Sequence, residues 1–580
     1  MENVNLKING LNVTAPAGST ILEAAHGAGI RIPTLCWLKE INEIGACRMC
    51  VVEVKGAKGL VAACVYPVSE GMEVKTNTKR LLDARKRTLE LLLSTHDKKC
   101  LSCVRSGHCE LQELCQELGV EDEDHFAGER NHYETDTSAV HMIRDNNKCI
   151  LCRRCSAVCE KVQSVGVIGP NNRGFATFIG SAFEMGLGDT SCVGCGQCIA
   201  ACPTGALYEK DNTDDVLAAI ADESKHVVVQ TAPAVRAALG EEFGYPMGTD
   251  VEGKMAAALR RIGFDKVFDT DFSADLTIME EAHEFLDRVQ NGGVLPMMTS
   301  CSPGWIKYCE HYYPDQLAHL SSCKSPQQMF GAITKTYYAE KMGIPPEDIV
   351  CVSVMPCTAK KFELQRDDQD AAGVPDVDIS ITTRELARLI RKVGINFRSL
   401  PDEGFDDPLG ESTGAGVIFG TTGGVMEAAL RTAVEKLTGK QLEKPEFTEV
   451  RGTDGIKEAT YNVAGIDVKV AVASGLANAK IIMDKVRSGE ADYHFIEIMC
   501  CPGGCVNGGG QPQVHADVRN FEDVKAIRAK ALYDNDAAKT IRKSHENPAI
   551  RKVYEEYLGE PGSERAHQIL HTTYVKRSIN

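Results

Sequence analysis

One cysteine spacing occurs twice near the middle of the chain, and this repeat constrains the fold more than any other feature. Each copy reads C-x2-C-x2-C-x3-C, and Pro203 follows the second copy. The repeated cysteines are Cys149, Cys152, Cys155 and Cys159, then Cys192, Cys195, Cys198 and Cys202. Thiolates at this spacing bind [4Fe–4S] clusters, and in the duplicated run the fourth cysteine of each copy binds the cluster of the other copy. The two copies must therefore fold against each other.

The repeat resembles the two-cluster ferredoxins of bacteria. This resemblance implies a two-cluster ferredoxin domain over residues 136–210, with two accessory [4Fe–4S] clusters. The crossed ligand sets are Cys149, Cys152, Cys155 and Cys202 for one cluster, and Cys192, Cys195, Cys198 and Cys159 for the other. Two copies of so specific a run are not explained by cysteines that merely pack in a core.

The start of the chain predicts a small sheet packed on one helix. An alternating apolar and polar pattern surrounds Asn9-Gly10, a two-residue hairpin signal, and Thr20 with Glu23 forms a helix capping box. Four cysteines follow with the spacing C-x10-C-x2-C-x13-C, namely Cys36, Cys47, Cys50 and Cys64. Four thiolates suit a [2Fe–2S] cluster, although zinc accepts them too. Because the hairpin, helix and cysteines resemble plant-type ferredoxins, we expect a β-grasp [2Fe–2S] domain over residues 1–80.

A fourth ligand set follows a helical pattern at residues 81–93. It offers one imidazole and three thiolates from His96, Cys100, Cys103 and Cys109. Three cysteines and one histidine are also a common structural zinc set, so zinc is the alternative to iron here. The pattern resembles the His-ligated [4Fe–4S] site that [FeFe]-hydrogenases share with the large iron–sulfur subunit of respiratory complex I. We therefore expect a cluster domain with one histidine and three cysteine ligands, holding a third accessory [4Fe–4S] cluster, over residues 81–135.

These sites use 15 of the 24 cysteines, and so many one-electron centres in a row indicate an electron relay. The formal net charge of −17 argues against nucleic acid as a partner. No run approaches the ~20 apolar residues of a membrane-spanning helix, and the first residues lack the basic and apolar regions of a signal peptide. We therefore expect a cytoplasmic protein of reducing, anaerobic surroundings.

The remaining chain predicts α/β layers. Short apolar strands such as 227–229 and 350–354 alternate with helical patterns such as 384–393. Residues 402–416 are rich in Asp, Gly, Pro and Ser, which predicts a surface loop. We expect a catalytic domain over residues 211–516, followed by a helical, cysteine-free segment over 517–580. The whole chain is then a multidomain protein of α+β and α/β class.

Three segments of this domain carry the chemistry. They begin at Thr299 (TSCSPGW), at Met355 (MPCTAKKFE) and at Glu497 (EIMCCPGGCVNGGGQP). They resemble the three signature segments of [FeFe]-hydrogenases, in the order of that family, and the clostridial type of modular enzyme is similar over nearly the whole chain. The resemblance implies a large two-lobed α/β H-cluster domain and reversible conversion of protons and electrons to hydrogen.

The implied H-cluster is a [4Fe–4S] cubane joined through one cysteine sulfur to a two-iron unit with CO, cyanide and a bridging dithiolate. From the residues alone, Cys357, Cys501 and Cys505 are thiolates beside glycines, which let the backbone approach a bulky cluster. By resemblance, Cys505 bridges to the two-iron unit and Lys360 donates to a cyanide. Met355 and Met499 match the flanking thioethers. Buried packing cysteines and an ordinary surface lysine are the plainer alternatives.

The first segment departs from the family pattern, which is usually Thr-Ser-Cys-Cys-Pro. This chain has Cys301 followed by Ser302, so the second cysteine, the usual cubane ligand, is missing. Cys301 in its place, oxygen ligation by Ser302, or compensation by Cys500 are the alternatives. We favour a cubane held by Cys301, Cys357, Cys501 and Cys505, because thiolate is the usual iron–sulfur ligand. We expect the other unassigned cysteines to be small buried packing residues, namely Cys115, Cys309, Cys323 and Cys351.

Protons need a chain of groups that gain and release them. Glu281, Glu284 and Arg288 lie at helical spacing, which by itself fits a solvated charged face. By resemblance, these three residues and Ser321 form the proton relay of the family.

Three functions compete. An enzyme that makes or consumes hydrogen needs the signature segments, an electron-conducting subunit lacks them, and a hydrogen sensor would carry a signalling module. We expect the enzyme, linked to ferredoxin or, through flavin partner subunits, to NAD(P)H, with electron bifurcation as an option. No Gly-x-Gly-x-x-Gly loop follows a strand, so a dinucleotide would bind another chain.

Overall fold

The N-terminal hairpin consists of β1 (Asn3–Ile8) and β2 (Leu11–Pro16), in the computed structural model that describes residues 2–463 and 465–579. Asn9 and Gly10 both have positive φ, 54° and 90°, as the tight turn requires. A five-stranded sheet forms in the order β2-β1-β5-β3-β4, and its other strands are β3 (Val51–Val54), β4 (Val61–Ala62) and β5 (Glu73–Lys75). The capping box of Thr20 and Glu23 opens α1 (Ile21–Gly27), so hairpin and cap are both confirmed.

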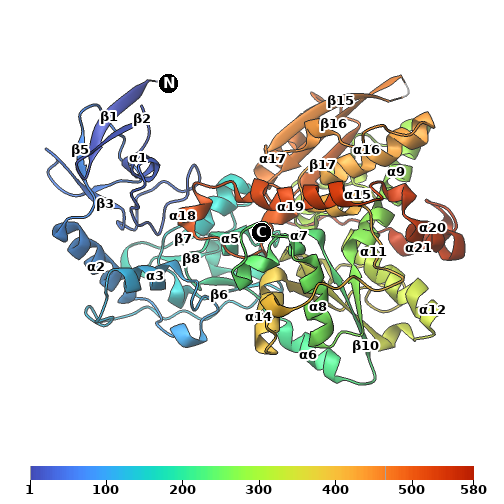
Figure 1. Cartoon of the computed structure of the whole chain (residues 1–580), viewed down its shortest axis with the longest axis horizontal. Coiled ribbons are helices and arrows are strands. Elements are labelled where there is room, and N and C mark those ends of the chain that lie inside the picture. The colour runs from blue at the N-terminus through green and yellow to red at the C-terminus, as the bar shows by residue number, and fades with distance from the viewer. Residues whose placement is uncertain (1, 464, 580) are drawn as a thin grey trace.

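Two helices lie below this sheet in Figure 1. The first is α2 (Lys79–Leu93), where a helix was predicted, and its N-cap Thr78 accepts a hydrogen bond from the Leu81 amide. The second is α3 (Glu110–Glu117). Leu89 and Leu93 of α2 share one small core with leucines of α3, so the loop that carries His96 and its neighbouring cysteines is held between them.

The duplicated cysteine run folds as two matching halves. A two-stranded antiparallel ladder joins β6 (Met142–Arg144) to β9 (Leu207–Glu209), and α4 (Arg154–Ala157) packs against α5 (Gln197–Ala201). Arg153 and Gly196, at the same place in each copy, both take the left-handed conformation just before their helix.

Two four-stranded sheets organise the larger part of the molecule, on the right of Figure 1. The first is wholly parallel, in the order β11-β10-β13-β14, and contains β10 (His226–Thr231), β11 (Lys266–Asp269), β13 (Ile349–Met355) and β14 (Ile379–Thr382). The second runs β12-β17-β16-β15, with β12 (Met297–Met298), β15 (Ile456–Val463), β16 (Ile466–Ser474) and β17 (Phe495–Met499). Strands predicted at 227–229 and 350–354 are confirmed as parts of β10 and β13.

Each of these two sheets is the centre of one lobe, and the long helix α9 (Thr270–Asn291) connects the two lobes. It packs on α11 (Pro326–Ile333) and on α16 (Gly424–Thr438). The helix predicted at 384–393 is α14 (Thr383–Lys392). The predicted surface loop 402–416 is wrong at its end, because α15 (Gly414–Val417) begins there and packs on α9. Small residues such as Gly416, whose β-carbon would lie 2.5 Å from the Asp271 carbonyl oxygen, allow that close approach.

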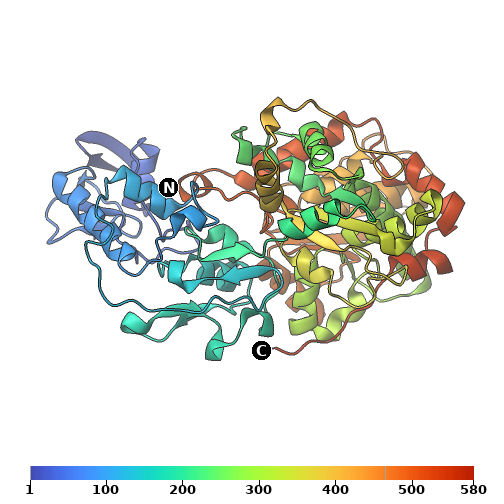
Figure 2. The same cartoon turned by 90° about the horizontal axis from the view of Figure 1, so that it is seen from below.

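The last segment wraps around both parts of the protein. It contains α18 (Ala516–Arg519), α19 (Val524–Ala538), α20 (Pro548–Val553) and α21 (Glu564–Leu570). Near its start, Phe521 stacks on His26 of α1 at 3.4 Å, and near its end the Arg577 amide donates to the Glu310 carbonyl at 3.0 Å. Figure 2 shows the end of the tail running along the lower edge of that view to the C-terminus. Within the described residues, no helix has both the length and the apolar character that crossing a membrane requires.

Candidate active site

The four cysteines predicted for a [2Fe–2S] cluster lie together near the start of β3 and the end of β4. All four are buried, the Cys50 and Cys64 sulfurs are 3.3 Å apart, and the Cys47 amide lies 3.5 Å from the Cys36 sulfur. Buried thiols so close to one another have no apolar packing reason to converge, whereas bound iron would stabilise them as thiolates. The donor set fits a two-iron cluster.

His96 lies in the next predicted site. It is 7% exposed, and its Nδ1 has no hydrogen-bond partner among the described residues. Burial lowers the pKa of this imidazole to about 4, so it is neutral, as a metal ligand must be. The Cys103 sulfur lies against Gly205, where a β-carbon would be 2.5 Å away, and the Cys109 sulfur lies 3.7 Å from the Pro203 carbonyl oxygen. This site therefore borders the second cysteine run.

Two cavities lie inside the ferredoxin-like domain. The crossed sets line one each: Cys149, Cys152, Cys155 and Cys202 surround the first, and Cys159, Cys192, Cys195 and Cys198 surround the second. The first is also close to the N-terminal domain, because Asn42 donates from Nδ2 to the carbonyls of Cys36 at 2.7 Å and Cys152 at 3.0 Å.

A third and larger cavity lies between the two lobes, where strands of both sheets end. Thr231 of β10, Met355 of β13 and Met499 of β17 are each the last residue of a strand, and the residues after them form the cavity wall. Carboxyl ends of parallel strands are where α/β proteins gather binding residues. All sulfur-bearing residues of the predicted H-cluster line this cavity, together with one from the ferredoxin-like domain; they are Cys195, Cys301, Cys357, Cys501, Cys505, Met355, Met499 and Cys500.

Glycines shape the wall of this cavity. A β-carbon on Gly508 would lie 2.1 Å from the Pro356 carbonyl oxygen, and one on Gly504 would lie 2.6 Å from the Thr422 amide. These glycines therefore let segments of the backbone pack closely against one another in the cavity wall. Burial and the neighbouring thiol Cys501 raise the pKa of Cys505 to about 12, so the Cys505 thiol needs a bound cation to ionise at neutral pH. The convergence of several cysteines on one cavity fits an iron–sulfur cofactor.

Lys360 reaches the cavity from α13 (Ala359–Glu363). It is 8% exposed, and its Nζ donates to Glu363 at 2.8 Å, to Ser325 Oγ at 2.8 Å and to the Cys301 carbonyl at 3.3 Å. Glu363 neutralises the buried charge, and the hydrogen bonds fix its direction. The ordinary surface lysine is thereby excluded.

The predicted relay residues lie along one side of α9. The Glu284 carboxylate accepts from Arg288 at 2.5 Å and from Ser321 Oγ at 2.9 Å. Glu281 is fully buried, and among the described residues neither of its carboxylate oxygens has a well-formed hydrogen bond. Burial, and then the charge of Glu284, raise its pKa to about 8. Besides burial, the Glu281 carboxylate helps to raise the pKa of the Cys301 thiol, and Cys301 lines the cavity. The predicted relay residues therefore reach the cavity through Cys301.

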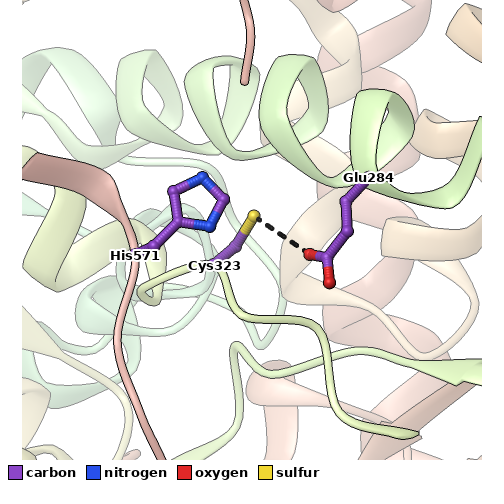
Figure 3. A group of neighbouring side chains, drawn as sticks. All are labelled: Glu284, Cys323 and His571. Atoms are coloured by element: carbon purple, nitrogen blue, oxygen red, sulfur yellow. Dashed lines mark hydrogen bonds between the residues drawn. The ribbon is translucent and has the colours of Figure 1, made fainter. Parts of the chain in front are cut away.

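Two residues that the sequence did not connect with the relay lie beside it. Figure 3 shows Cys323 and His571 facing Glu284, with the Cys323 sulfur 3.8 Å from Glu284 Oε2. His571 arrives from the C-terminal tail, and its Nδ1 lies 2.8 Å from Ser322 Oγ while its Nε2 lies 3.2 Å from Glu280 Oε2. No local spacing connects residue 571 to residue 284, so the sequence offered no signal for this contact.

The ferredoxin-like domain meets the catalytic cavity at a narrow seam. Thr358 Oγ1 donates to the Gly194 carbonyl at 2.7 Å. On the other side of the same loop, a β-carbon on Gly509 would lie 2.2 Å from the Cys195 carbonyl oxygen. Cys195 itself lines both the second ferredoxin cavity and the catalytic cavity. The two sites therefore share this residue in their walls.

Five known families match successive parts of the chain. They are a 2Fe-2S iron-sulfur cluster binding domain (residues 1–79), the NADH-ubiquinone oxidoreductase-G iron-sulfur binding region (85–124), a 4Fe-4S dicluster domain (148–206), the iron only hydrogenase large subunit, C-terminal domain (225–509), and the iron hydrogenase small subunit (522–577).

Individual proteins are similar over longer stretches. The NADP-reducing hydrogenase subunit HndD of Solidesulfovibrio fructosivorans is 54% identical and covers 100% of both chains, and iron hydrogenase 1 of Clostridium pasteurianum is 44% identical over 98% of this chain and 99% of its own. The structure of an apo [FeFe]-hydrogenase from Chlamydomonas reinhardtii, 45% identical, matches 64% of this chain and 100% of that chain with a TM-score of 0.57. The chain thus belongs to the iron-only, or [FeFe], hydrogenase family and is a catalytic hydrogenase subunit.

Proposed function

We propose that hydrogen is made and consumed in the cavity between the two lobes. The observation that carries this is the convergence there of Cys357, Cys501 and Cys505 with Lys360. These three thiolates and one further cavity donor would hold the cubane of an H-cluster, whose two-iron unit carries CO, cyanide and a bridging dithiolate. When bound, this cofactor supplies the redox chemistry that interconverts protons, electrons and hydrogen.

The surrounding residues would orient the cofactor and keep water out. Lys360 holds one positive charge at the cavity wall, in a direction fixed by Glu363 and Ser325, where it can donate to an anionic ligand of the two-iron unit. Met355 and Met499 are each 3% exposed and line the cavity as thioethers. Their polarisable sulfurs suit contact with an inorganic cluster better than a branched side chain would.

Protons would travel along the side of α9. Arg288 fixes the Glu284 carboxylate, Ser321 joins Glu284, and the buried Glu281 comes next before Cys301. A carboxyl with a pKa of about 8 gains and releases a proton near neutral pH, which is the property that a relay needs.

Electrons would reach the cavity through one [2Fe–2S] cluster and three accessory [4Fe–4S] clusters. The contacts of Asn42 with Cys36 and Cys152, and those of Cys103 and Cys109 with the Pro203–Gly205 loop, support two inputs that meet at the same ferredoxin cluster. The second ferredoxin cluster then adjoins the catalytic cavity through Cys195.

The electron partner is proposed to be a flavin-bearing subunit that uses NAD(P)H, with ferredoxin as a second partner and bifurcation between them. The support is the similarity to a subunit of an NADP-reducing hydrogenase over the full length of both chains. Two inputs into one relay are also what a complex with two electron donors would use. Such a complex would work in the cytoplasm, where NAD(P)H is available.

Metal analysis tests the cofactor assignment. The anaerobically purified, maturated protein should contain iron for one [2Fe–2S] cluster, three accessory [4Fe–4S] clusters and an H-cluster, and should turn over hydrogen with a reduced viologen. Zinc as the principal metal, or no turnover at full iron content, would overturn it. Purification of the native protein with its associated subunits tests the partner assignment, and a protein that remains alone and reacts with ferredoxin only would contradict the complex.

A further inference from the structure

The missing cysteine at position 302 leaves the fourth cubane donor open. Three side chains at the cavity offer a sulfur or oxygen in place of it: Cys301, Ser302 and Cys500. Their positions in the cavity wall differ, and the differences distinguish them.

Ser302 and Cys500 occupy the same corner of the cavity. Ser302 immediately precedes α10 (Pro303–Tyr312), and its Oγ accepts a hydrogen bond from the Cys500 amide at 3.2 Å. In the first turn of α10, a β-carbon on Gly304 would lie 2.7 Å from the Cys500 sulfur. The absence of a side chain at 304 therefore leaves room for a sulfur that comes from residue 500 instead of from residue 302.

Cys500 lines the cavity together with the other predicted cubane ligands. The residue is 4% exposed, and the thiols that act most strongly on its own thiol are Cys195, a predicted ligand of the second ferredoxin cluster, and Cys501, a predicted cubane ligand. Cys500 and Cys501 follow the last residue of β17, and the chain bends at both positions. Because the strand alternation has ended there, two successive side chains can lie on one side of the chain, towards the cavity that both of them line.

Cys301 lies in a different corner. Its carbonyl accepts from Lys360, and the charged groups that act on its thiol are Glu281, Cys505, Glu497 and Lys360. The Cys301 sulfur thus lies between the cavity and the predicted relay.

We propose, as a refinement that rests on the proposed function, that Cys500 is the fourth cubane ligand beside Cys357, Cys501 and Cys505. Ser302 holds the Cys500 backbone and does not bind iron, and Cys301 remains a free thiol at the cavity end of the relay. This differs from the expectation from sequence, which gave Cys301 the ligand role. Binding forms one iron–sulfur bond and releases the thiol proton of Cys500. A thiolate is also a softer donor to an iron–sulfur cluster than a serine oxygen.

Position 302 and position 500 have in effect exchanged roles. A cysteine at 302 would place its sulfur next to the Cys500 backbone, on the same part of the cavity wall, because the Ser302 hydroxyl already accepts from the Cys500 amide. The inference therefore predicts that the thiol can be moved back. Rescue of the cubane by a cysteine at 302 would indicate that the two positions exchange the ligand role, because a mere packing defect at 500 would not be repaired in this way.

The experiment uses the full chain made without the maturation of the two-iron unit, so that the cavity holds the cubane alone. Iron and sulfide per chain are counted, and the cubane is followed by EPR after reduction. Cys500→Ala should lose about four irons per chain or give a three-iron signal, whereas Ser302→Ala and Cys301→Ala should retain the cubane. The double substitution Ser302→Cys with Cys500→Ala should restore it.

Cys309→Ala is the matched control, because Cys309 is a fully buried cysteine in the same apolar cluster as Cys500 and does not line the cavity. It should keep all iron. An unchanged cubane in Cys500→Ala, loss of the cubane in Cys301→Ala or Ser302→Ala, or equal loss in Cys309→Ala and Cys500→Ala would overturn the inference. Failure of the proposed function is a separate result, since the unsubstituted protein would then show no cubane beyond its accessory clusters.

Discussion

The N-terminal part and the catalytic part differ in how far apart in the sequence their predicted iron ligands lie. In the first 210 residues each ligand set comes from one or two short segments, and the cores around them are small. In the catalytic part the donors come from segments separated by up to about two hundred residues, which meet only because strands of two sheets end at one cavity. A substitution in the N-terminal part can therefore remove one accessory cluster site and leave the others intact. The catalytic cavity, by contrast, depends on the packing of both lobes. Substitutions at increasing distance from the cavity should therefore have decreasing effects.

The largest effect is expected for Cys505→Ala. Cys505 lines the cavity and is the predicted bridge to the two-iron unit, so the variant should lose that unit and all hydrogen turnover. Hydrogen production from a reduced viologen and total iron are the measurements, and the accessory clusters should persist as EPR signals. Intact turnover in a folded Cys505→Ala protein would remove the basis for treating the cavity as the catalytic part.

Glu281→Gln should reduce turnover by roughly 10²–10⁴-fold, the usual contribution of a positioned proton-transfer group. The iron content should not change, because Glu281 lines no cluster cavity. Burial and Glu284 raise the pKa of Glu281 to about 8, so the carboxyl keeps its proton below that pH and loses it above. The rate of hydrogen production should therefore fall as the pH rises through about 8, and this break should be missing from Glu281→Gln. Asp287→Asn, at an exposed position of the same helix, serves as the control; an equal loss there would indicate a general effect of charge.

A smaller effect is expected at the seam between the two parts. Gly509→Ala would place a β-carbon 2.2 Å from the Cys195 carbonyl oxygen, so the ferredoxin loop must shift away from the cavity. Turnover should remain, but electron transfer from the accessory clusters should slow, measured as the rate at which pre-reduced accessory clusters are reoxidised by protons. Gly404→Ala is the control, since nothing lies within 4 Å of a β-carbon there. Equal rates in both variants would mean that the seam is not the route.

The smallest effect on the chemistry is expected for Cys36→Ala, in the domain farthest along the relay. This variant should lose the [2Fe–2S] signal and keep hydrogen turnover with an artificial one-electron donor. Delivery from the physiological donor should be impaired. If turnover with the artificial donor fell as far as in Glu281→Gln, the distinction between the two parts of the molecule would not hold.

Local features of the fold were predictable because neighbours in the sequence determine them. The turn at Asn9-Gly10, the cap at Thr20 and the helix of residues 79–93 all follow from spacing and conformational preference. The crossed cysteine sets likewise follow from the repeat, and each set lines one cavity.

Contacts across the fold were not predictable in the same way. The corner shared by Ser302 and Cys500, and the approach of His571 to Glu284, join residues separated by about two hundred residues or more. Only the packing of the two lobes and of the C-terminal tail determines such distances. The helix at 414–417 was missed for a related reason: its glycines indicate a loop when read locally, but they serve the close packing of α15 on α9.

The seam at Thr358 and Gly509 also has a consequence for biogenesis. The hydrogen bond of 2.7 Å from Thr358 to Gly194, and the glycine packing beside it, close this wall of the cavity with backbone. A preassembled cluster cannot pass through a wall of that kind. A cubane that enters on this side must therefore be inserted before the ferredoxin-like domain docks. On that route the order of folding determines the order of cofactor loading.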